Sequence, residues 1–93
     1  MWIQLFEEEV ENLLNDTSWS YGSASQTFHK SGITEYNAGR PSIGNWRAYV
    51  GGYCSEWPPN AGWDCYDLFL DVDSGAIKFV SEGGDETIGT PVN

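Results

Sequence analysis

Residues 65–72 read CYDLFLDV, and they form the stretch that most strongly predicts secondary structure in this 93-residue chain. They are rich in strand-forming residues, and their side chains alternate between two faces. The turn-forming residues 73–75 (DSG) follow, and residues 76–80 (AIKFV) read as a returning strand. We therefore expect an antiparallel hairpin. Its first strand places Tyr66, Leu68, Leu70 and Val72 on one face and Asp67, Phe69 and Asp71 on the other.

At the N-terminal end of the chain, apolar side chains recur at helical spacing. Ile3, Phe6, Val10, Leu13 and Leu14 lie three or four residues apart, which predicts an amphipathic helix that ends before the poor helix formers of residues 15–18. A helix of about 13 residues is marginal alone, so it must pack on other structure.

The segments between the helix and the hairpin read as short strands and turns. A bulge or sharp bend is expected at Gly51-Gly52, and residues 37–44 and 57–63 read as loops. Residues 81–93 are either a final short strand or a loose C-terminal tail. Together these elements predict a single small α+β domain, residues 1–93, in which one N-terminal helix packs on a four- or five-stranded antiparallel sheet (meander).

The charge is strongly negative and unevenly placed. The chain has 14 Asp and Glu against 4 Lys and Arg, a formal net charge of −10, with 15% aromatic residues. Residues 1–16 and 56–93 carry nearly all of the acids, around a nearly neutral middle. A chain of this charge is repelled by phosphate backbones, so direct nucleic-acid binding is not expected.

Other features bear on the compartment. The chain has no apolar run long enough to span a membrane and no recognisable secretory signal, so we expect a cytoplasmic protein. Cys54 and Cys65 are the only cysteines. In a reducing cytosol two such thiols are usually free, although a disulfide between them is geometrically possible.

The sequence contains no strong catalytic, metal or cofactor motif. Asp71, Asp73 and Glu82 match some positions of a calcium loop, but Gly75 and Ala76 occupy positions where that loop needs an oxygen ligand and a glycine. His29 is the only histidine, and it lacks a motif that would make it catalytic. We therefore expect a protein that is not an enzyme and that has no cofactor and no metal.

The acidic side chains form the first candidate site. Glu7, Glu8 and Glu11 share an exposed helix face, and Asp64, Asp67, Asp71 and Asp73 recur along the strongest predicted strand and its turn. Residues of one parity on a strand are spaced about 6–7 Å apart, comparable to phosphates along one nucleic-acid strand. A row of carboxylates that could occupy a cationic groove is predicted at Asp67, Asp71 and Asp73, with Phe69 as an apolar anchor.

The tryptophans form the second candidate site. Trp57 and Trp63 flank a proline-containing loop, and aromatic side chains on loops often anchor interfaces. The alternative interpretation is that the two indoles only hold the loop against the sheet.

Three functions remain as hypotheses. The first is a non-enzymatic inhibitor of a basic, nucleic-acid-handling protein, such as a phage anti-CRISPR protein that mimics nucleic acid. The second is a bacterial immunity protein against a nuclease toxin; residues 70–79 loosely resemble one hairpin of SUKH-superfamily immunity proteins, a match too short to assign the family. The third is a carbohydrate-binding module lined by tryptophans. A small hydrolase would require a pocket that holds His29.

Overall fold

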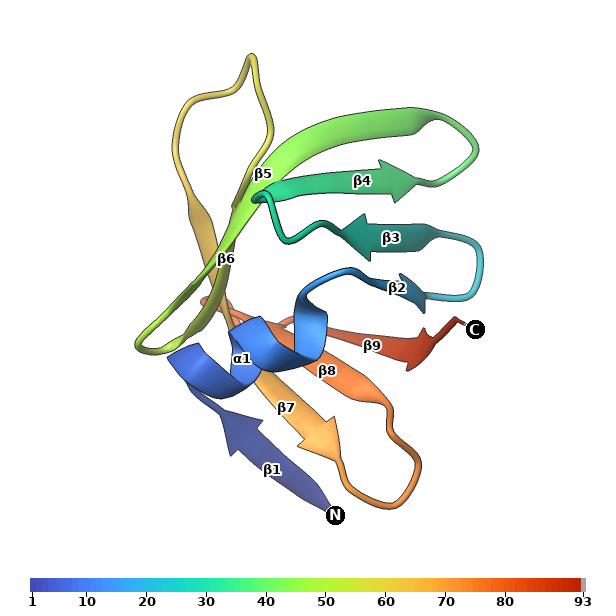
Figure 1. Ribbon diagram of the computed structural model, residues 1–93, viewed down its shortest axis with the longest axis vertical. Coiled ribbons are helices and arrows are strands. Elements are labelled where there is room, and N and C mark those ends of the chain that lie inside the picture. The colour runs from blue at the N-terminus through green and yellow to red at the C-terminus, as the bar shows by residue number, and fades with distance from the viewer. Residues whose placement is uncertain (93) are drawn as a thin grey trace.

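The computed structural model describes residues 1–92 and shows a closed, antiparallel, eight-stranded β-barrel with one short helix (Figure 1). The helix and the strands have the following bounds: β1 Trp2–Leu5, α1 Glu7–Leu14, β2 Thr17–Ser20, β3 Ser25–Phe28, β4 Ile33–Asn37, β5 Pro41–Tyr49, β6 Gly52–Glu56, β7 Asp64–Asp71, β8 Ile77–Ser81 and β9 Glu86–Pro91.

The barrel has up-and-down topology. Each strand from β2 to β9 pairs with the next one in sequence, and β9 returns to pair with β2 through Trp19↔Pro91 and Ser20↔Thr90. Closure removes the free sheet edges that an open sheet would leave exposed. β1 lies outside this ring. It pairs with residues 68–71 of β7, whereas β6 pairs with residues 64–66 of the same strand.

The prediction of an α+β fold, with a helix on a four- or five-stranded sheet, is therefore wrong. The prediction counted too few strands, because several of them give only weak sequence patterns. β2 and β3, for example, are four residues long and rich in Ser and Thr. Their stability comes from pairing on both edges, which a single-segment pattern does not report.

The N-terminal segment also differs from the prediction. Residues Trp2–Leu5 form a strand, and the helix is confined to Glu7–Leu14. The backbone N–H and C=O groups of β1 pair with β7 and do not form the hydrogen bonds of a longer helix. Tertiary context therefore overrides the helical spacing of Ile3 and Phe6.

Two local predictions are confirmed, and one open alternative is resolved. Residues 65–71 and 77–81 form the predicted hairpin, with Leu68 opposite Phe79. The bend expected at Gly51-Gly52 is the turn between β5 and β6, where Tyr49 pairs with Gly52. Within the C-terminal segment, Glu86–Pro91 form strand β9, which closes the barrel.

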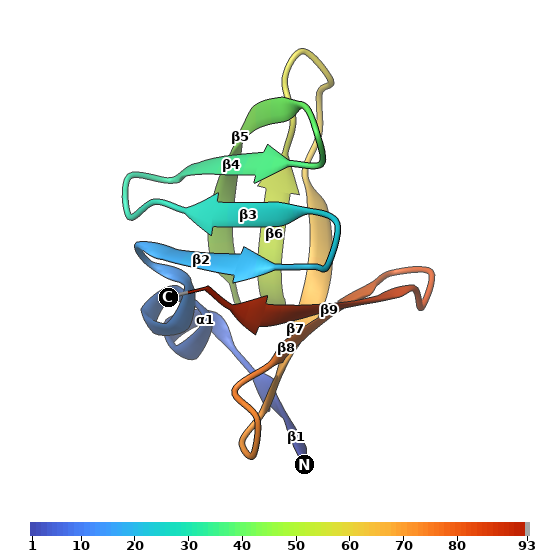
Figure 2. The same ribbon diagram turned by 90° about the vertical axis from the view of Figure 1, so that its right-hand side faces the viewer.

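The two ends of the barrel differ (Figure 2). We call one end the base: it holds the turns at 29–32, 50–51 and 72–76, and α1 packs there against β2, β5 and β6. We call the opposite end the mouth; it holds the turns at 21–24, 38–40, 57–63 and 82–85. In Figure 2 α1 lies on the left, and three of the mouth turns project to the right.

The base is filled by apolar side chains. Val10 and Leu14 of α1 are fully buried and belong to one core cluster with Trp19, Phe28 and Trp46. Phe28 packs edge-on against Trp46, with ring centroids 5.5 Å apart. The helix therefore closes this end of the barrel and leaves the mouth as its open end.

Candidate functional site

A cavity of about 610 Å³ lies at the mouth. It is of the size that binds small organic molecules, and barrel mouths are common places for such sites. Six of its lining residues are aromatic: Tyr21, Tyr36, Tyr53, Trp57, Tyr66 and Phe79. The other lining residues are polar or aliphatic, and none carries a formal charge: Gln26, Ser42, Ile43, Ser55, Pro58, Asn60 and Thr87.

Strand alternation places the aromatic rings in the cavity. On β6 the inward residues are Tyr53 and Ser55, whereas Cys54 between them points outward. Two glycines make room for rings. A Cβ at Gly89 would lie 2.8 Å from the Tyr21 ring, and one at Gly44 would lie 2.6 Å from the Trp57 ring.

The rings contact one another in edge-to-face and offset arrangements. The centroids of Tyr53 and Phe79 lie 5.1 Å apart, those of Tyr21 and Phe79 6.1 Å, and those of Tyr36 and Trp57 6.1 Å. These separations lie in the favourable range for aromatic pairs. The wall of the cavity is therefore a connected set of rings whose positions are fixed by their neighbours.

A hydrogen-bonded network fixes the polar part of the cavity. Tyr21 donates its hydroxyl hydrogen to Gln26 Oε1 over 2.7 Å, and Gln26 Nε2 donates to Thr34 Oγ1 and to the Tyr53 hydroxyl over 2.9 and 3.3 Å. Trp57 Nε1 donates to Ser55 Oγ over 3.2 Å. Gln26 and Thr34 are buried, so these bonds satisfy groups that would otherwise be costly to bury.

The tyrosine hydroxyls are held in the neutral form. Burial raises the pKa of Tyr53 to about 12 and raises that of Tyr21 further, with nearby tyrosines adding to the Tyr21 shift. Burial also raises the pKa of Tyr66, assisted by the carboxylate of Asp64. The cavity therefore offers hydroxyl groups and ring faces but no formal charge of its own.

The rim of the mouth is acidic. The turns and strand ends around the cavity carry one base, Arg40, and five acids: Glu56, Asp64, Glu82, Asp85 and Glu86. None of these five carboxylates takes part in an ion pair within residues 1–92, where ion pairs use only Asp71, Asp73 and Glu35. The rim therefore makes the mouth electrostatically negative.

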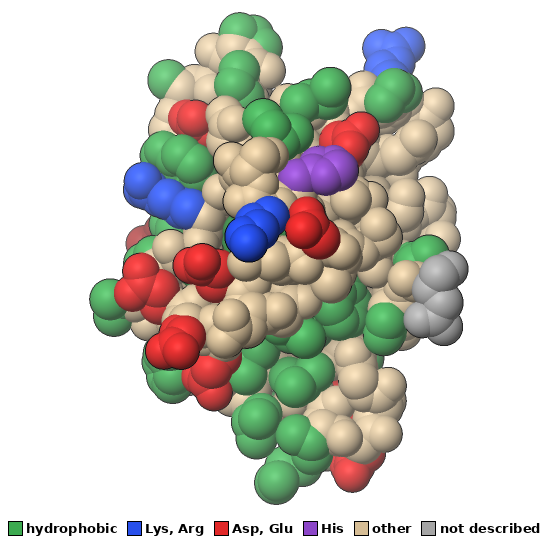
Figure 3. Space-filling view, viewed as in Figure 1, with side chains coloured by type: hydrophobic (Ala, Val, Ile, Leu, Met, Phe, Trp, Pro, Cys, Tyr) green, Lys and Arg blue, Asp and Glu red, His purple; other side chains and the backbone are tan. Residues whose placement is uncertain are grey.

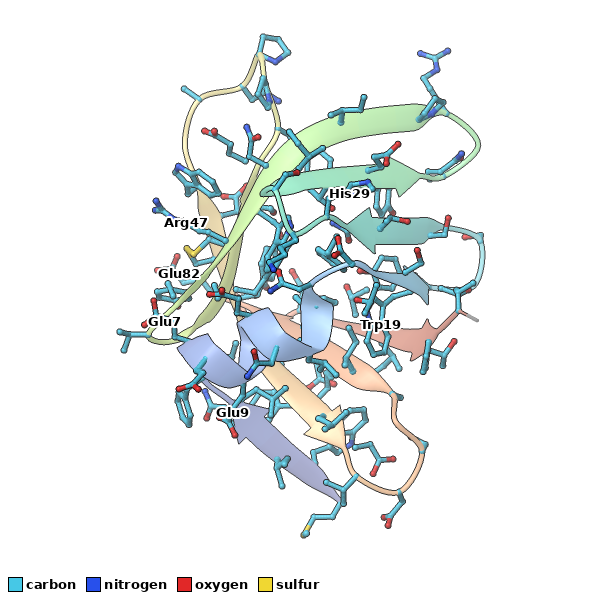
Figure 4. All side chains as sticks on the ribbon, in the orientation of Figure 1. Glu7, Glu9, Trp19, His29, Arg47 and Glu82 are labelled. Atoms are coloured by element: carbon cyan, nitrogen blue, oxygen red, sulfur yellow. A yellow bond between two sulfur atoms is a disulfide. The ribbon has the colours of Figure 1, made fainter. Side chains whose placement is uncertain are left out.

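The predicted helix face is present. Glu7, Glu8 and Glu11 are all exposed on α1, and acidic side chains gather over the helix at the lower left of Figure 3. Figure 4 shows Glu7 and Glu9 projecting from this helix. Glu9 also accepts a hydrogen bond from the backbone N–H of Phe6 over 3.1 Å. This acidic surface belongs to the base and lies at the opposite end of the barrel from the cavity.

The predicted row of carboxylates is partly neutralised by the N-terminal ammonium group. Asp67 is exposed, but Asp71 and Asp73 both accept hydrogen bonds from the amino group of Met1, at 2.8 and 2.9 Å. This ammonium, with hydrogen bonds from Ser74 and the Asp73 backbone, lowers the pKa of Asp71 to about 2.

Phe69 stands between Asp67 and Asp71 in the row. The Lys78 ammonium lies 5.3 Å from the centroid of its ring and 4.6 Å from that of Trp2. The outer face of β7 therefore mixes acids, rings and cations, and Asp64, at the start of β7, belongs instead to the mouth rim.

The two loop tryptophans take part in different contacts. Trp57 lines the mouth cavity, whereas Trp63 stacks beneath the Arg47 guanidinium, whose carbon lies 4.2 Å from the indole centroid. Trp63 lines a second, smaller concavity of about 320 Å³. Only Trp57 therefore belongs to the aromatic cavity.

The cysteines are joined, contrary to the expectation of free thiols. Cys54 on β6 and Cys65 on β7 are direct cross-strand partners, with Cα atoms 4.0 Å apart, and they form a disulfide. The two side chains meet because the register of β6 and β7 places them opposite each other, which neither cysteine spacing nor compartment specifies.

The histidine does not belong to the cavity. His29 Nε2 pairs with Glu35 Oε2, and both side chains are substantially exposed, His29 in the base turn at 29–32 and Glu35 on β4. Among residues 1–92 no group of three or more His, Cys, Asp or Glu side chains is placed to hold a metal ion. The helix in that part of the chain is too short to cross a membrane.

Sequence reasoning missed most of the cavity residues. Gln26, Tyr36, Tyr53 and Phe79 come from four different strands and Tyr21 from the turn after β2, and no local motif links them. The available signal was the number of tyrosines, five in 93 residues, several of them in strands with a fixed parity. No protein-family model, curated protein or solved structure matches this chain.

Proposed function

We propose that this protein binds a small organic molecule in the mouth of its barrel and that it does so without catalysis. The observation that carries the proposal is the cavity of about 610 Å³ with six aromatic rings and no charged group in its lining. Such a lining binds the faces of a ligand, and a few fixed polar groups set its orientation.

The organisation of the site supports binding over chemistry. The Tyr21, Gln26 and Tyr53 side chains form hydrogen bonds with one another, and Tyr21 and Tyr53 keep their protons because burial raises the pKa of each hydroxyl. A general base near neutral pH would need a pKa close to that range. The single histidine lies outside this lining.

The proposal is tested by screening small molecules for binding, with variants of two tryptophans on the same loop. Trp57→Ala removes a ring from the cavity, and Trp63→Ala removes one outside it. Ligands found by a shift in thermal unfolding or by calorimetry should lose at least about tenfold in affinity in Trp57→Ala. They should bind Trp63→Ala as they bind the unaltered protein. Equal losses in both variants would contradict the mouth site.

A second candidate function is a stoichiometric inhibitor of a basic, nucleic-acid-handling protein. The observation that favours it is that ion pairs within residues 1–92 involve only three of the 14 carboxylates. Glu7, Glu8 and Glu11 therefore present uncompensated charge, which accelerates association with a basic partner and makes it salt-sensitive.

This second candidate predicts a partner-binding surface at the base. The triple variant Glu7→Gln, Glu8→Gln, Glu11→Gln should weaken capture of a partner from the native host, and Trp57→Ala should leave it unchanged. Capture that resists both high salt and the triple variant would remove the inhibitor hypothesis.

A further inference from the structure

We infer that the ligand of the mouth cavity is an organic cation with an alkylated ammonium group, held by the faces of the aromatic rings. The inference rests on the proposed function and names the chemical class of its ligand. Two independent observations carry it: the rings that line the cavity and the charge around its rim.

The lining suits a cation that cannot donate hydrogen bonds. Trp and Tyr rings carry negative potential on their faces, and several rings around one site form the aromatic cages that bind quaternary ammonium groups. In this cavity Trp57, Tyr36 and Tyr21 lie toward the mouth, and Tyr53 and Phe79 lie deeper. A compact alkylated ammonium needs contact surface and negative potential, and both are available without a carboxylate in the lining.

The rim selects the sign of the charge. Five acids and one base surround the mouth, and the whole chain has a formal net charge of −10. An anionic ligand would be repelled on approach, and the cavity has no Lys or Arg to hold it. A cationic ligand would be attracted, because a charged rim raises the local concentration of the opposite charge.

The arrangement of the basic residues supports the same inference. Arg47 lies over the Trp63 ring, and Lys78 lies over the rings of Trp2 and Phe69. Neither forms an ion pair with a carboxylate within residues 1–92. On the outer surface of this protein, cations therefore already rest on aromatic rings, and the mouth offers a larger set of such rings with none of its own cations on them.

The test uses two probes of nearly the same shape, choline and 3,3-dimethylbutan-1-ol, in which carbon replaces the nitrogen of choline. Binding is measured by calorimetry or by chemical-shift changes of the cavity residues. Choline should bind at least about tenfold more tightly than the neutral probe. Raising the salt concentration should weaken choline binding and leave the neutral probe unaffected.

Variants separate the rings from the rim. Trp57→Leu keeps an apolar side chain but removes the ring, so the preference for choline should fall severalfold, and Trp63→Leu is the matched control. The rim variant Glu82→Gln, Asp85→Asn, Glu86→Gln should reduce choline affinity about two- to fivefold without changing the neutral probe. Thermal unfolding of each variant verifies that it is folded.

The outcomes distinguish this inference from the proposed function. Equal affinity for the two probes, with loss of both in Trp57→Leu, would overturn the cation inference and support a site for neutral ligands. Failure of both probes to bind at millimolar concentration would also overturn it, and the broader screen would then decide whether the mouth binds any small molecule.

Discussion

The base and the mouth are built from the same eight strands, yet they contain different chemistry. At the base, α1 closes the barrel with Val10 and Leu14, and the core is largely apolar. Its two tryptophans each bond their one polar atom: Trp46 Nε1 donates to the His29 carbonyl over 2.8 Å, and Trp19 Nε1 donates to Thr17 Oγ1 over 2.9 Å. At the mouth the inward residues are mainly hydroxyl-bearing or aromatic and the space between them is open. One end of the barrel therefore holds a closed apolar core, and the other holds an open cavity.

The largest expected effect comes from the base. Leu14→Ala removes a fully buried side chain that joins the helix to the core, and it should lower the free energy of unfolding by about 2–5 kcal/mol. Chemical denaturation measures this loss. Trp57→Ala, at the half-buried rim of the cavity, should cost much less stability while it impairs binding. A larger stability loss in Trp57→Ala than in Leu14→Ala would contradict the division between the two ends.

The disulfide should give the next effect. It closes a loop with a sequence separation of 11 residues, which contains the mouth segment 57–63. Replacing both cysteines, Cys54→Ser and Cys65→Ala, should destabilise the fold by about 2–3 kcal/mol in the chain-entropy description. Reduction of the unaltered protein with a thiol should likewise lower its melting temperature. An unchanged melting temperature after verified reduction would argue against the prediction.

The mouth tyrosines predict a loss of stability at alkaline pH. The pKa of Tyr53 is about 12 in the folded protein and near 10 when unfolded, so folding favours the protonated hydroxyl. Its contribution is complete below about pH 10 and declines as the pH rises from 10 to 12, by up to about 2–3 kcal/mol. Denaturation curves of the unaltered protein and Tyr53→Phe, compared between pH 8 and pH 12, should diverge above pH 10, with the variant less sensitive to pH. Parallel curves would count against the role of Tyr53.

The smallest effect is expected on the outer surface of α1. Replacing Glu7, Glu8 and Glu11 by Gln removes three exposed charges that form no ion pair within residues 1–92, so the free energy of unfolding should change by less than about 0.5 kcal/mol. Glu7 and Glu8 lie in the first turn, where the helix dipole favours acids, so any change should be slightly destabilising. Urea denaturation measures it, and a large loss would show that these residues stabilise the fold.

Local features were predictable where one segment contained the whole signal. The hairpin of β7 and β8 was predictable because its strands and turn are consecutive, and the alternation of residues 66–71 identified their two faces. Barrel closure was not predictable, because it depends on β9 reaching β2, and the short strands β2 and β3 give weak local patterns.

The candidate site shows the same limit. The exposed acids of α1 could be assigned from helical spacing, and Trp57 could be singled out as a loop aromatic. The contribution of Tyr21, Tyr53 and Phe79 to the cavity could not be predicted. These residues converge only when the end of β2, β6 and β8 are brought together in one barrel.

By itself the sequence determined the net charge, the aromatic content and the alternation of the strongest strands, because these are properties of composition and of neighbouring residues. Only the tertiary structure decided that the sheet closes, that Cys54 meets Cys65, and that uncharged rings gather inside an acidic rim. Those features depend on strand register and on which end of the barrel α1 covers, and both are set by contacts between segments distant in the chain.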